Sequence, residues 1–550
     1  MSVMTSVEDP AKLRRVVIAS SAGTVFEWYD FFIFGALAGI VSKHFYANLP
    51  DSQAFIFTLL TFAVGFIVRP LGALVFGKIG DSKGRKGAFV VTITVMGLAT
   101  FAIGLLPDYN QIGILAPVLL VTCRVLQGFA LGGEYGGAAI YVAEHAPAGK
   151  RGWNTAWIQT SAALGLFAAL GVILLARTLL GESAFRDWGW RIPFLVSLGL
   201  LALSLWIRLR LEESPAFQKI KDEGRTSDKV MAESFMHWPN LRLVVLTLFG
   251  LMMAQGVVWY TGNFYTQFFL ERLLKVPSVD VNLLMIAVTA VSAVLYVFFG
   301  WLSDHVGRKP VMVFGMAVML IAYFPGFHFL THATNPALAE AQARAPVVVT
   351  ADPAACTFQL DLTGGAHQFS TACDIAKGAL SGAGVNYHNA PSPPGSGAQV
   401  RVGDTVLDVP SAVGQTPGGV KEVRAQFEAS LRTTLAQAGY PSQADPARIN
   451  WALAFGVLVV FIVAATALYG PLAACLVELF PTRIRYTAMS LPYHLGTGWF
   501  GGLQPAISFA IVTAVGDIYA GLWFPFVVTG IALMVALVFL PETRHRDIHA

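Results

Sequence analysis

Five charged side chains lie well away from the ends of the long apolar stretches of this chain, where charge is costly. They are Glu27, Asp30, Arg69, Arg124 and Glu134. Ionisable groups in such surroundings are rare and are usually functional, because hydrocarbon gives them no hydration. A carboxyl group there can take up and release a proton, and a guanidinium can hold a carboxylate through two parallel hydrogen bonds. We therefore predict proton coupling by Glu27, Asp30 and Glu134, and solute binding by Arg124 and Arg69.

The sequence also leaves a structural role open for the same five side chains. Glu27 and Asp30 are three residues apart, so they lie on neighbouring parts of one helix face. These two acids and Glu134 could form permanent ion pairs with Arg69 and Arg124. Proton coupling requires a polar cavity between helices, whereas permanent pairing requires only packed helices.

The second half of the chain contributes polar side chains without charge to its apolar stretches. We predict that they complete a solute site, although helix packing is the alternative for each. His494 could titrate near neutral pH, or could be a hydrogen-bonded structural histidine. The candidates are Gln255, Tyr260, Asn263, Tyr469 and His494.

The composition indicates that the solvent of this chain is a lipid bilayer. Of its 550 residues, 55% are hydrophobic and only 13% are charged, and the mean hydropathy is +0.61. About 20 apolar residues cross the hydrocarbon layer as a helix. Stretches of this kind come in two groups of six on either side of a polar segment: 16–41, 53–77, 88–107, 111–142, 153–180 and 189–209, then 241–270, 280–302, 311–331, 451–477, 486–514 and 519–540.

Basic residues are distributed unevenly over the short loops between these stretches. Most of them fall on one side, including Arg14, Arg15, Lys86, Lys309 and Arg544. Short loops rich in lysine and arginine stay in the cytoplasm. The pattern predicts that both ends of the chain are cytoplasmic.

Two loop motifs occur once in each half of the chain. Residues 77–86, which read Gly-Lys-Ile-Gly-Asp-Ser-Lys-Gly-Arg-Lys, return as Gly-Trp-Leu-Ser-Asp-His-Val-Gly-Arg-Lys at 300–309, and the Glu-x-x-Pro motif at 144–147 returns at 478–481. Repetition of this kind is typical of transporters built from two similar halves. We predict that the charges pair across helices and latch one conformation; the alternative is a solvated loop that only orients the protein. The latch candidates are Asp81, Arg85, Glu144, Arg151, Asp304, Arg308, Glu478 and Arg483.

The segment 332–450 interrupts the second group of apolar stretches and is predicted to be a folded domain outside the cell membrane. Residues 399–409 alternate around Gly403-Asp404, which predicts a hairpin with a two-residue turn. Apolar residues at helical spacing between 420 and 435 predict a helix. The segment holds Cys356 and Cys373, and disulfides persist outside the cytoplasm. We predict that the two cysteines pair; two free thiols are the alternative.

The paired loop motifs resemble the signature between helices 2 and 3, and 8 and 9, of the major facilitator superfamily. Three further motifs are similar to its metabolite:H+ symporter family: Glu27-Trp-Tyr-Asp-Phe, Arg124-Val-Leu-Gln-Gly and Trp188-Gly-Trp-Arg. The resemblance covers nearly the whole chain except 332–450. It implies an all-α membrane protein with twelve transmembrane helices in two pseudo-symmetric six-helix bundles. The periplasmic α/β domain that we predict between helices 9 and 10 departs from the family pattern, so the resemblance assigns it no role. The resemblance also implies a bacterial inner membrane location.

This resemblance implies a secondary active transporter that imports a small polar metabolite with protons by alternating access. Our first substrate class is an organic carboxylate. The alternatives are a zwitterionic osmolyte of the proline or betaine type, or a nutrient receptor that does not transport. We predict no enzyme activity, since no phosphate-binding loop or nucleophile motif is present.

The predicted organisation is an N-terminal bundle at 1–210, a cytoplasmic loop at 211–240, a C-terminal bundle at 241–331 and 451–550, and the periplasmic domain at 332–450. The expected partners are the solute, the proton and the lipid bilayer. We expect no cofactor, no metal, no nucleic acid and a monomeric protein.

Overall fold

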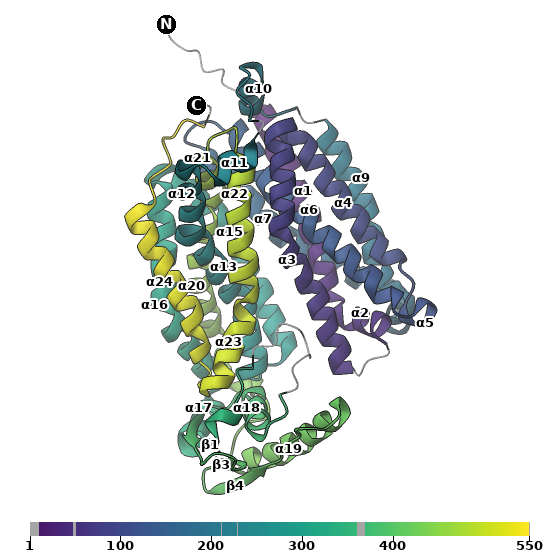
Figure 1. The fold of residues 1–550 in the computed structure, drawn as a ribbon, viewed down its shortest axis with the longest axis vertical. Coiled ribbons are helices and arrows are strands. Elements are labelled where there is room, and N and C mark those ends of the chain that lie inside the picture. The colour runs from purple at the N-terminus through teal and green to yellow at the C-terminus, as the bar shows by residue number, and fades with distance from the viewer. Residues whose placement is uncertain (1–9, 48–50, 211, 228, 360–368, 549–550) are drawn as a thin grey trace.

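A computed structural model describes residues 10–47, 51–210, 212–227, 229–359 and 369–548. Two groups of long helices lie side by side, and a small mixed domain lies at one end of them (Figure 1). We call that end the insertion end. The short helices α10 (Pro215–Asp222) and α11 (Val230–Phe235) lie at the opposite end, which we call the α10 end.

The N half consists of the helices up to Leu209. Its long helices pack mainly against one another, with the α3 and α6 pair in most extensive contact. They are α1 (Pro10–Ala36), α3 (Asp51–Lys83), α4 (Arg85–Leu105), α6 (Leu115–His145), α7 (Arg151–Leu180) and α9 (Arg191–Leu209), with the short α2 (Ala38–Phe45), α5 (Tyr109–Ile112), α8 (Glu182–Ala184) and π-helical η1 (Phe185–Gly189) between them.

The C half begins at Trp238 with a helical run to Leu273 that alternates between α-helical and π-helical turns. The run comprises α12 (Trp238–Thr247), η2 (Leu248–Met252), α13 (Met253–Tyr260), η3 (Thr261–Tyr265), α14 (Thr266–Phe268) and η4 (Phe269–Leu273). It is followed by α15 (Ser278–Val306), α16 (Arg308–Thr334), α20 (Trp451–Tyr469), α21 (Leu472–Leu479), α22 (Arg485–His494), η7 (Leu495–Gly501), α23 (Gly502–Val515), η8 (Ala520–Leu522) and α24 (Trp523–Phe539).

Within the described residues, 11 helices are long and apolar enough to cross a membrane. They correspond to every stretch expected from the sequence except 53–77, which falls within α3 (Asp51–Lys83). Many of their large apolar side chains face outward, for example Leu174, Ile321 and Val538. Such exposure suits a surface that contacts lipid instead of water.

Glycines on α6 bring it very close to its neighbours. A Cβ atom on Gly132 would lie 2.2 Å from the carbonyl oxygen of Arg69, and one on Gly128 would lie 2.2 Å from that of Gly65. The close approach of α3 and α6 therefore sets the position of Arg69. Gly35 and Gly39 share the same four-residue spacing in the sequence, but a Cβ atom at either would meet nothing within 4 Å.

The described part of the insertion, residues 336–359 and 369–450, folds as a four-stranded sheet with helices beside it. The strand order is β2-β1-β3-β4, and β1 pairs in parallel with β2 and antiparallel with β3. The elements are α17 (Pro336–Arg344), β1 (Val347–Ala351), η5 (Pro353–Ala355), α18 (Ala372–Ala383), β2 (Tyr387–Pro391), β3 (Ala398–Val402), β4 (Thr405–Val409), α19 (Pro417–Gln437) and η6 (Pro446–Arg448).

Three sequence predictions for this domain are confirmed. β3 and β4 form the expected hairpin, with Val402 opposite Thr405. The helix expected after it is α19. A disulfide joins Cys356 to Cys373 and so ties the segment after β1 to the start of α18.

Candidate functional site

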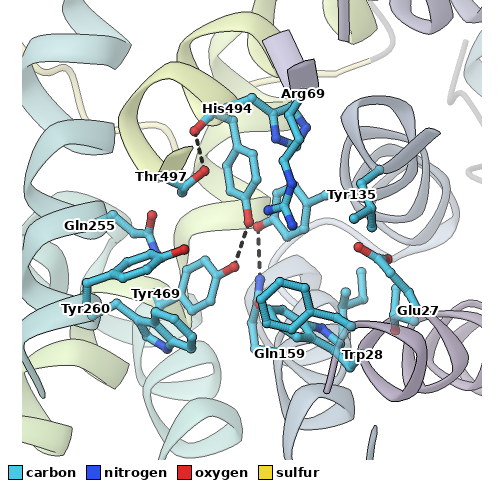
Figure 2. Close-up of a pocket in the computed structure, with 16 residues that line it drawn as sticks. Glu27, Trp28, Arg69, Tyr135, Gln159, Gln255, Tyr260, Tyr469, His494 and Thr497 are labelled. Carbon is cyan, nitrogen blue, oxygen red and sulfur yellow. Dashed lines mark hydrogen bonds between the residues drawn. The ribbon is translucent and has the colours of Figure 1, made fainter. Parts of the chain in front are cut away.

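A narrow cavity lies between the two halves, about midway along the helices. It offers about 50 Å³ of space for water, enough for only a few water molecules. The side chains around it come from α1, α3, α6 and α7 of the N half and from α13, α20, α22 and η7 of the C half (Figure 2). Five predicted solute residues line this cavity: Arg69, Gln255, Tyr260, Tyr469 and His494.

Glu27 and Arg69 bring opposite charges to the cavity. Both are half-buried, and among the described residues neither forms a hydrogen bond or an ion pair. The guanidinium of Arg69 lies 4.4 Å from the ring centre of Phe66, and its buried Nε has no hydrogen-bond partner within the described chain. Glu27 lies within electrostatic reach of Arg69 and of Arg208. Both charges are therefore free to meet a solute.

Aromatic rings form much of the cavity wall. Tyr135 of the N half stacks on Tyr493 of the C half, with 3.9 Å between ring centres and 7° between planes. The hydroxyls of Tyr493 and Tyr469 are 2.6 Å apart, and Gln159 Nε2 donates to the Tyr135 hydroxyl at 2.9 Å. These contacts join the two halves on one side of the cavity.

A second group of rings comes from Trp28 and Trp259, whose centres are 6.3 Å apart. Tyr260 packs edge-on against Trp259 at 5.2 Å. Their π faces are suited to an alkylated ammonium group, which is attracted to electron-rich rings. The cavity thus offers a guanidinium, a carboxylate and an aromatic surface.

Glu134 does not line the cavity. It is buried and forms a two-point ion pair with Arg208 from the end of α9: Arg208 Nη2 donates to Oε1, and Nη1 donates to Oε2 at 3.2 Å. Thr92 Oγ1 also donates to Glu134 at 2.9 Å. The structural alternative, in which Glu134 is permanently paired, fits this geometry, but the partner is Arg208 instead of Arg69 or Arg124.

Asp30 and Arg124 also lie away from the cavity lining. Thr100 Oγ1 donates to Asp30 at 3.0 Å and accepts from Gln127 Nε2 at 2.6 Å. Arg124 Nη1 donates to Gln127 Oε1 at 2.8 Å, and its guanidinium lies 4.3 Å from the ring centre of Phe34. The structure thus joins these two charges in a polar chain among α1, α4 and α6.

Asn263 is the other predicted solute residue outside the cavity. Its Nδ2 donates to the backbone oxygen of Trp259 one turn earlier, at 2.9 Å. This bond directs the side chain along its own helix, and no role in the cavity follows from it.

The first copy of the repeated motif lies at the α10 end and bridges the two halves. Asp81 accepts hydrogen bonds from the backbone N–H groups of Tyr486 and Thr487, at 3.1 and 2.8 Å, at the start of α22. Arg85 pairs with Asp81 at 2.6 Å and donates to the backbone oxygen of Thr482 at 2.5 Å. A carboxylate at a helix N-terminus is favoured by the free N–H groups and the helix dipole.

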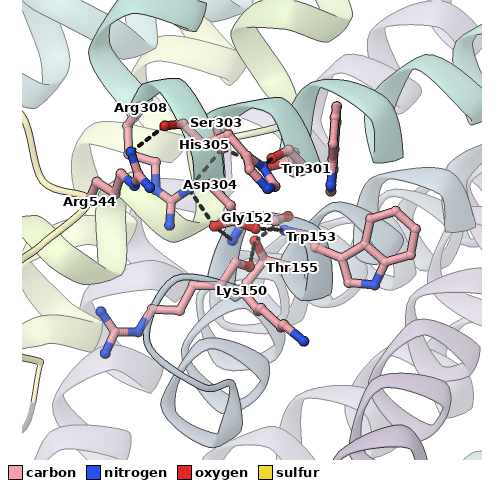
Figure 3. Close-up of polar contacts among 12 residues, drawn as sticks. Lys150, Gly152, Trp153, Thr155, Trp301, Ser303, Asp304, His305, Arg308 and Arg544 are labelled. Carbon is pink, nitrogen blue, oxygen red and sulfur yellow. Dashed lines mark hydrogen bonds and ion pairs between the residues drawn. The ribbon is translucent and has the colours of Figure 1, made fainter.

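The second copy repeats this geometry with the halves exchanged. Asp304 accepts from the backbone N–H groups of Gly152 and Trp153, at 2.9 and 2.7 Å, at the start of α7 (Figure 3). Arg308 pairs with Asp304 at 2.7 Å and with Glu478 at 3.1 Å. Arg151 of the N half reaches the same Glu478 at 3.5 Å.

Two glycines and two further carboxylates complete the repeat. Gly84 and Gly307 have φ angles of 122° and 111°, which L side chains rarely adopt. An arginine follows each glycine, and its backbone N–H donates to a carboxylate that lies just after the last long helix of the same half. Arg85 donates to Glu213 at 3.0 Å, and Arg308 donates to Glu542 at 2.9 Å.

Arg483 is not part of this network. Its side chain is exposed and pairs with Glu233. The expected position is taken by Arg485, which is fully buried and pairs with Glu144 across the halves at 2.6 Å. Arg485 is the first residue of α22, as Arg151 is the first residue of α7, so these two arginines are the equivalent pair.

Comparison with known proteins identifies the family. Residues 15–351 match the family described as sugar (and other) transporter. This chain belongs to that family. The proline/betaine transporter of Escherichia coli K12 is 37% identical over 334 residues, which are 58% of this chain and 66% of the relative. The shikimate transporter of the same organism is 36% identical, over 58% of this chain and 72% of the relative.

Solved structures show the fold of this transporter. The proton:xylose symporter XylE, a major facilitator superfamily protein, superimposes with a TM-score of 0.63 and covers 98% of both chains at 15% identity. The resemblance to major facilitator transporters is confirmed. The relatives named here are all transporters, which confirms the expectation of transport instead of catalysis.

Several site residues were not among the sequence candidates. Tyr135, Gln159, Trp28, Trp259 and Tyr493 line the cavity. An aromatic residue in an apolar stretch carries no signal that separates lining from packing. Arg208 was not a candidate because it lies beside the basic central loop, where arginine is expected simply because the loop is cytoplasmic.

Proposed function

We propose that this protein is a proton-coupled importer of small zwitterionic solutes with a carboxylate and an alkylated ammonium group. The observation that carries the proposal is the pair of free opposite charges, Glu27 and Arg69, in a cavity walled by aromatic rings. The relatives include a proline/betaine transporter, and the two solutes in its name have this chemistry. Our first substrate class from the sequence, a simple organic carboxylate, uses only part of this site.

The solute carboxylate is assigned to Arg69. A guanidinium can hold a carboxylate with two parallel hydrogen bonds, and Arg69 has a buried donor with no partner among the described residues. The ammonium group is assigned to the rings of Trp28, Trp259 and Tyr260. Gln255, whose buried Oε1 has no partner among the described residues, can accept from an N–H group where the solute has one.

Glu27 is assigned as the proton carrier. It is the one predicted acid among the three that lines the cavity, whereas Glu134 is held by Arg208 and Asp30 by the chain to Arg124. Protonation of Glu27 would remove one charge from the site when a solute with its own positive group enters. Solute and proton transport are then coupled if the protein without solute changes conformation only when the charge of Glu27 and the other charges of the site cancel.

The charge network is assigned as the latch of alternating access. Asp81, Asp304, Glu144 and Glu478 each contact the other half at the α10 end. These contacts can exist only while that end is closed, so they favour a conformation open toward the insertion end. With the α10 end in the cytoplasm, as the basic loops indicate, this is the outward-facing state.

The finer topology belongs to the same proposal. We assign α3 as the twelfth transmembrane helix, both ends of the chain to the cytoplasm and the insertion to the periplasm of a bacterial inner membrane. The domain boundaries proposed are 1–210, 211–240, 241–331 with 451–550, and 332–450. The disulfide in the insertion is consistent with an oxidising compartment.

The experiment is uptake of labelled glycine betaine, proline and shikimate into proteoliposomes with an acidic outside and an inside-negative potential. One proton moving through 100 mV supplies about 2.3 kcal/mol. Because 1.4 kcal/mol is a factor of ten, a neutral zwitterion should accumulate about 50-fold. Collapse of the gradient should abolish this accumulation.

Glu27→Gln separates coupling from binding. The variant should lose gradient-driven accumulation and keep exchange of labelled for unlabelled solute, since exchange needs no proton movement. The matched control is Glu182→Gln, an exposed acid paired with Arg186 at the insertion end. If shikimate accumulates and the two zwitterions do not, the solute proposal is wrong; if Glu27→Gln still accumulates solute, the proton assignment is wrong.

A further inference from the structure

A second cavity lies where the insertion meets the C half. It has a volume of about 350 Å³, which is within the usual range for small-molecule sites. It is lined by α17 and α18 on one side and by α19 on the other, and Lys275 reaches it from the end of the helical run that began at Trp238. Figure 1 shows α18 and α19 next to each other beneath that run.

Most of the cavity wall is apolar. Leu338, Leu431, Leu435 and Tyr440 are buried side chains of the insertion core that also face this space, and Val385 joins them from the segment before β2. Such a surface can accommodate the hydrocarbon part of a ligand.

The charge around the cavity is mainly positive. Lys275 and Arg432 both line it, and Arg272 lies within electrostatic reach of Lys275. Glu428, one turn before Arg432 on α19, is the acid in the lining. The pKa of Lys275 is lowered, first by burial and then by the charges of Arg272 and Arg432, so this ammonium lies in a positive field.

Lys275 is held firmly in place. Its backbone has a φ of 58°, the positive-φ region that residues other than glycine seldom adopt. Its Nζ donates to the backbone oxygen of Gly382 at 2.5 Å, and its own carbonyl oxygen accepts from Ala444 at 3.0 Å. One of the three ammonium protons is used in this contact, so donors remain for a ligand.

We propose that this second cavity binds a small organic anion, with its carboxylate at Lys275 and Arg432 and its apolar body against Leu431 and Leu435. The two cations and the apolar wall lie on the same cavity, which is the arrangement that an amphipathic carboxylate requires. The site lies at the insertion end of the helical run that carries Gln255 and Tyr260 of the central cavity. Binding here does not depend on which solute crosses the membrane.

The experiment uses the complete protein in nanodiscs and two fluorinated probes observed by 19F NMR. 4-Fluorophenylacetate carries the carboxylate, and 4-fluorophenylacetamide has the same shape without charge. We expect saturable binding of the acid and at least tenfold weaker binding of the amide. Equal affinity for both probes, or no saturable binding of the acid, would overturn the proposal.

Variants locate the binding site. Arg432→Gln, at an exposed position on α19, should weaken binding of the acid at least fivefold, and Lys421→Gln, another exposed cation of α19 outside the cavity lining, should not. Arg69→Gln tests the central cavity. Binding lost in Arg69→Gln but unchanged in Arg432→Gln would place the probe in the central cavity and reject the second site.

A Glu428→Gln variant should bind the acid as well or better, because it removes the one opposing charge in the lining; weaker binding would contradict the anion assignment.

Discussion

The repeated carboxylates of the latch make a quantitative prediction, which Asp304→Asn tests most directly. Asp304 accepts two backbone N–H bonds from the other half, at 2.9 and 2.7 Å. Hydrogen bonds to charged groups contribute about 1.5 to 3 kcal/mol each. Asparagine keeps one acceptor oxygen but loses the charge, so about 2 kcal/mol of attraction between the halves should disappear.

This loss acts on one conformation only. In the proposed opening of the α10 end, Gly152 and Trp153 move away from residue 304 in both the wild-type protein and the variant. The contact of residue 304 with Arg308 stays within the C half. A change of about 2 kcal/mol corresponds to roughly 30-fold in the ratio of closed to open molecules, at 1.4 kcal/mol per factor of ten. Asp81→Asn should have a similar effect, because Asp81 makes the equivalent pair of bonds to Tyr486 and Thr487.

The measurement is the distance distribution between spin labels at Ser82 and His305, two exposed positions at the α10 end of different halves. The matched control is Glu542→Gln, which removes the charge that accepts hydrogen bonds from the backbone N–H groups of Arg308 and Lys309 of its own half, at 2.9 and 3.0 Å, and keeps one acceptor oxygen. The control should lower stability without changing the populations. If Asp304→Asn leaves the populations unchanged, or if Glu542→Gln shifts them as far, the latch reasoning is refuted.

Three further predictions concern the cavity, the helix packing and the insertion. Trp28→Ala should raise the KM for glycine betaine about tenfold in uptake assays and Trp28→Phe much less, since cation–π attraction is worth about 1 to 2 kcal/mol in a desolvated site; equal effects would exclude ring recognition. Gly132→Ala should destabilise the protein by about 1 to 3 kcal/mol in thermal unfolding, because its Cβ would meet Arg69 at 2.2 Å, whereas Gly39→Ala, which meets nothing within 4 Å, should be nearly neutral. Cys356→Ser should cost the insertion about 3 kcal/mol, because the disulfide closes a loop with a separation of 17 residues; hydrogen exchange should rise in the insertion and not in α3 or α6.

Local patterns in the sequence predicted what depends on short-range chemistry. The positions of Asp81 and Asp304 follow from a motif that occurs twice in the chain. The Gly403-Asp404 turn fixes the register of β3 and β4. Glycine spacing alone does not predict helix contacts. Gly128 and Gly132 lie where α6 approaches α3, whereas Gly35 and Gly39 have the same spacing and a Cβ atom there would meet nothing within 4 Å. A small residue permits a close contact but does not create one.

Partners that are distant in the chain could not be predicted. Glu134 and Arg208 are 74 residues apart, and their pairing depends on how α6 and α9 pack. The choice between Arg483 and Arg485 depends on where α22 begins, since its first residue is turned toward Glu144 and the residue two positions earlier is exposed. The repeat itself held a signal that favoured Arg485, because Arg485 follows Glu478 at the same spacing as Arg151 follows Glu144, whereas Arg483 lies two residues closer to Glu478.

The attachment of the insertion is compatible with the proposed alternating access, in which the two halves move relative to each other. Among the described residues, its hydrogen bonds to the bundle go to the C half alone: Tyr387 donates to Gly516 at 2.7 Å, Asn386 accepts from Ile518 at 2.9 Å and Lys377 donates to Ala514 at 3.1 Å. Asn450 returns the chain to α20 with a bond to Ala333 at 2.7 Å. The ends of the insertion are therefore held close together at the ends of α16 and α20, which pack extensively against each other.

Such an attachment leaves the relative motion of the halves free. A domain fixed to both halves would have to break its contacts in every cycle, and each broken contact would add to the barrier. A domain fixed to one half moves with it as a rigid body and adds no such cost. The second cavity, bounded by Lys275 of the C half and by the insertion, should therefore keep its shape in both conformations, so its affinity for an anion should not change when Asp304→Asn opens the α10 end.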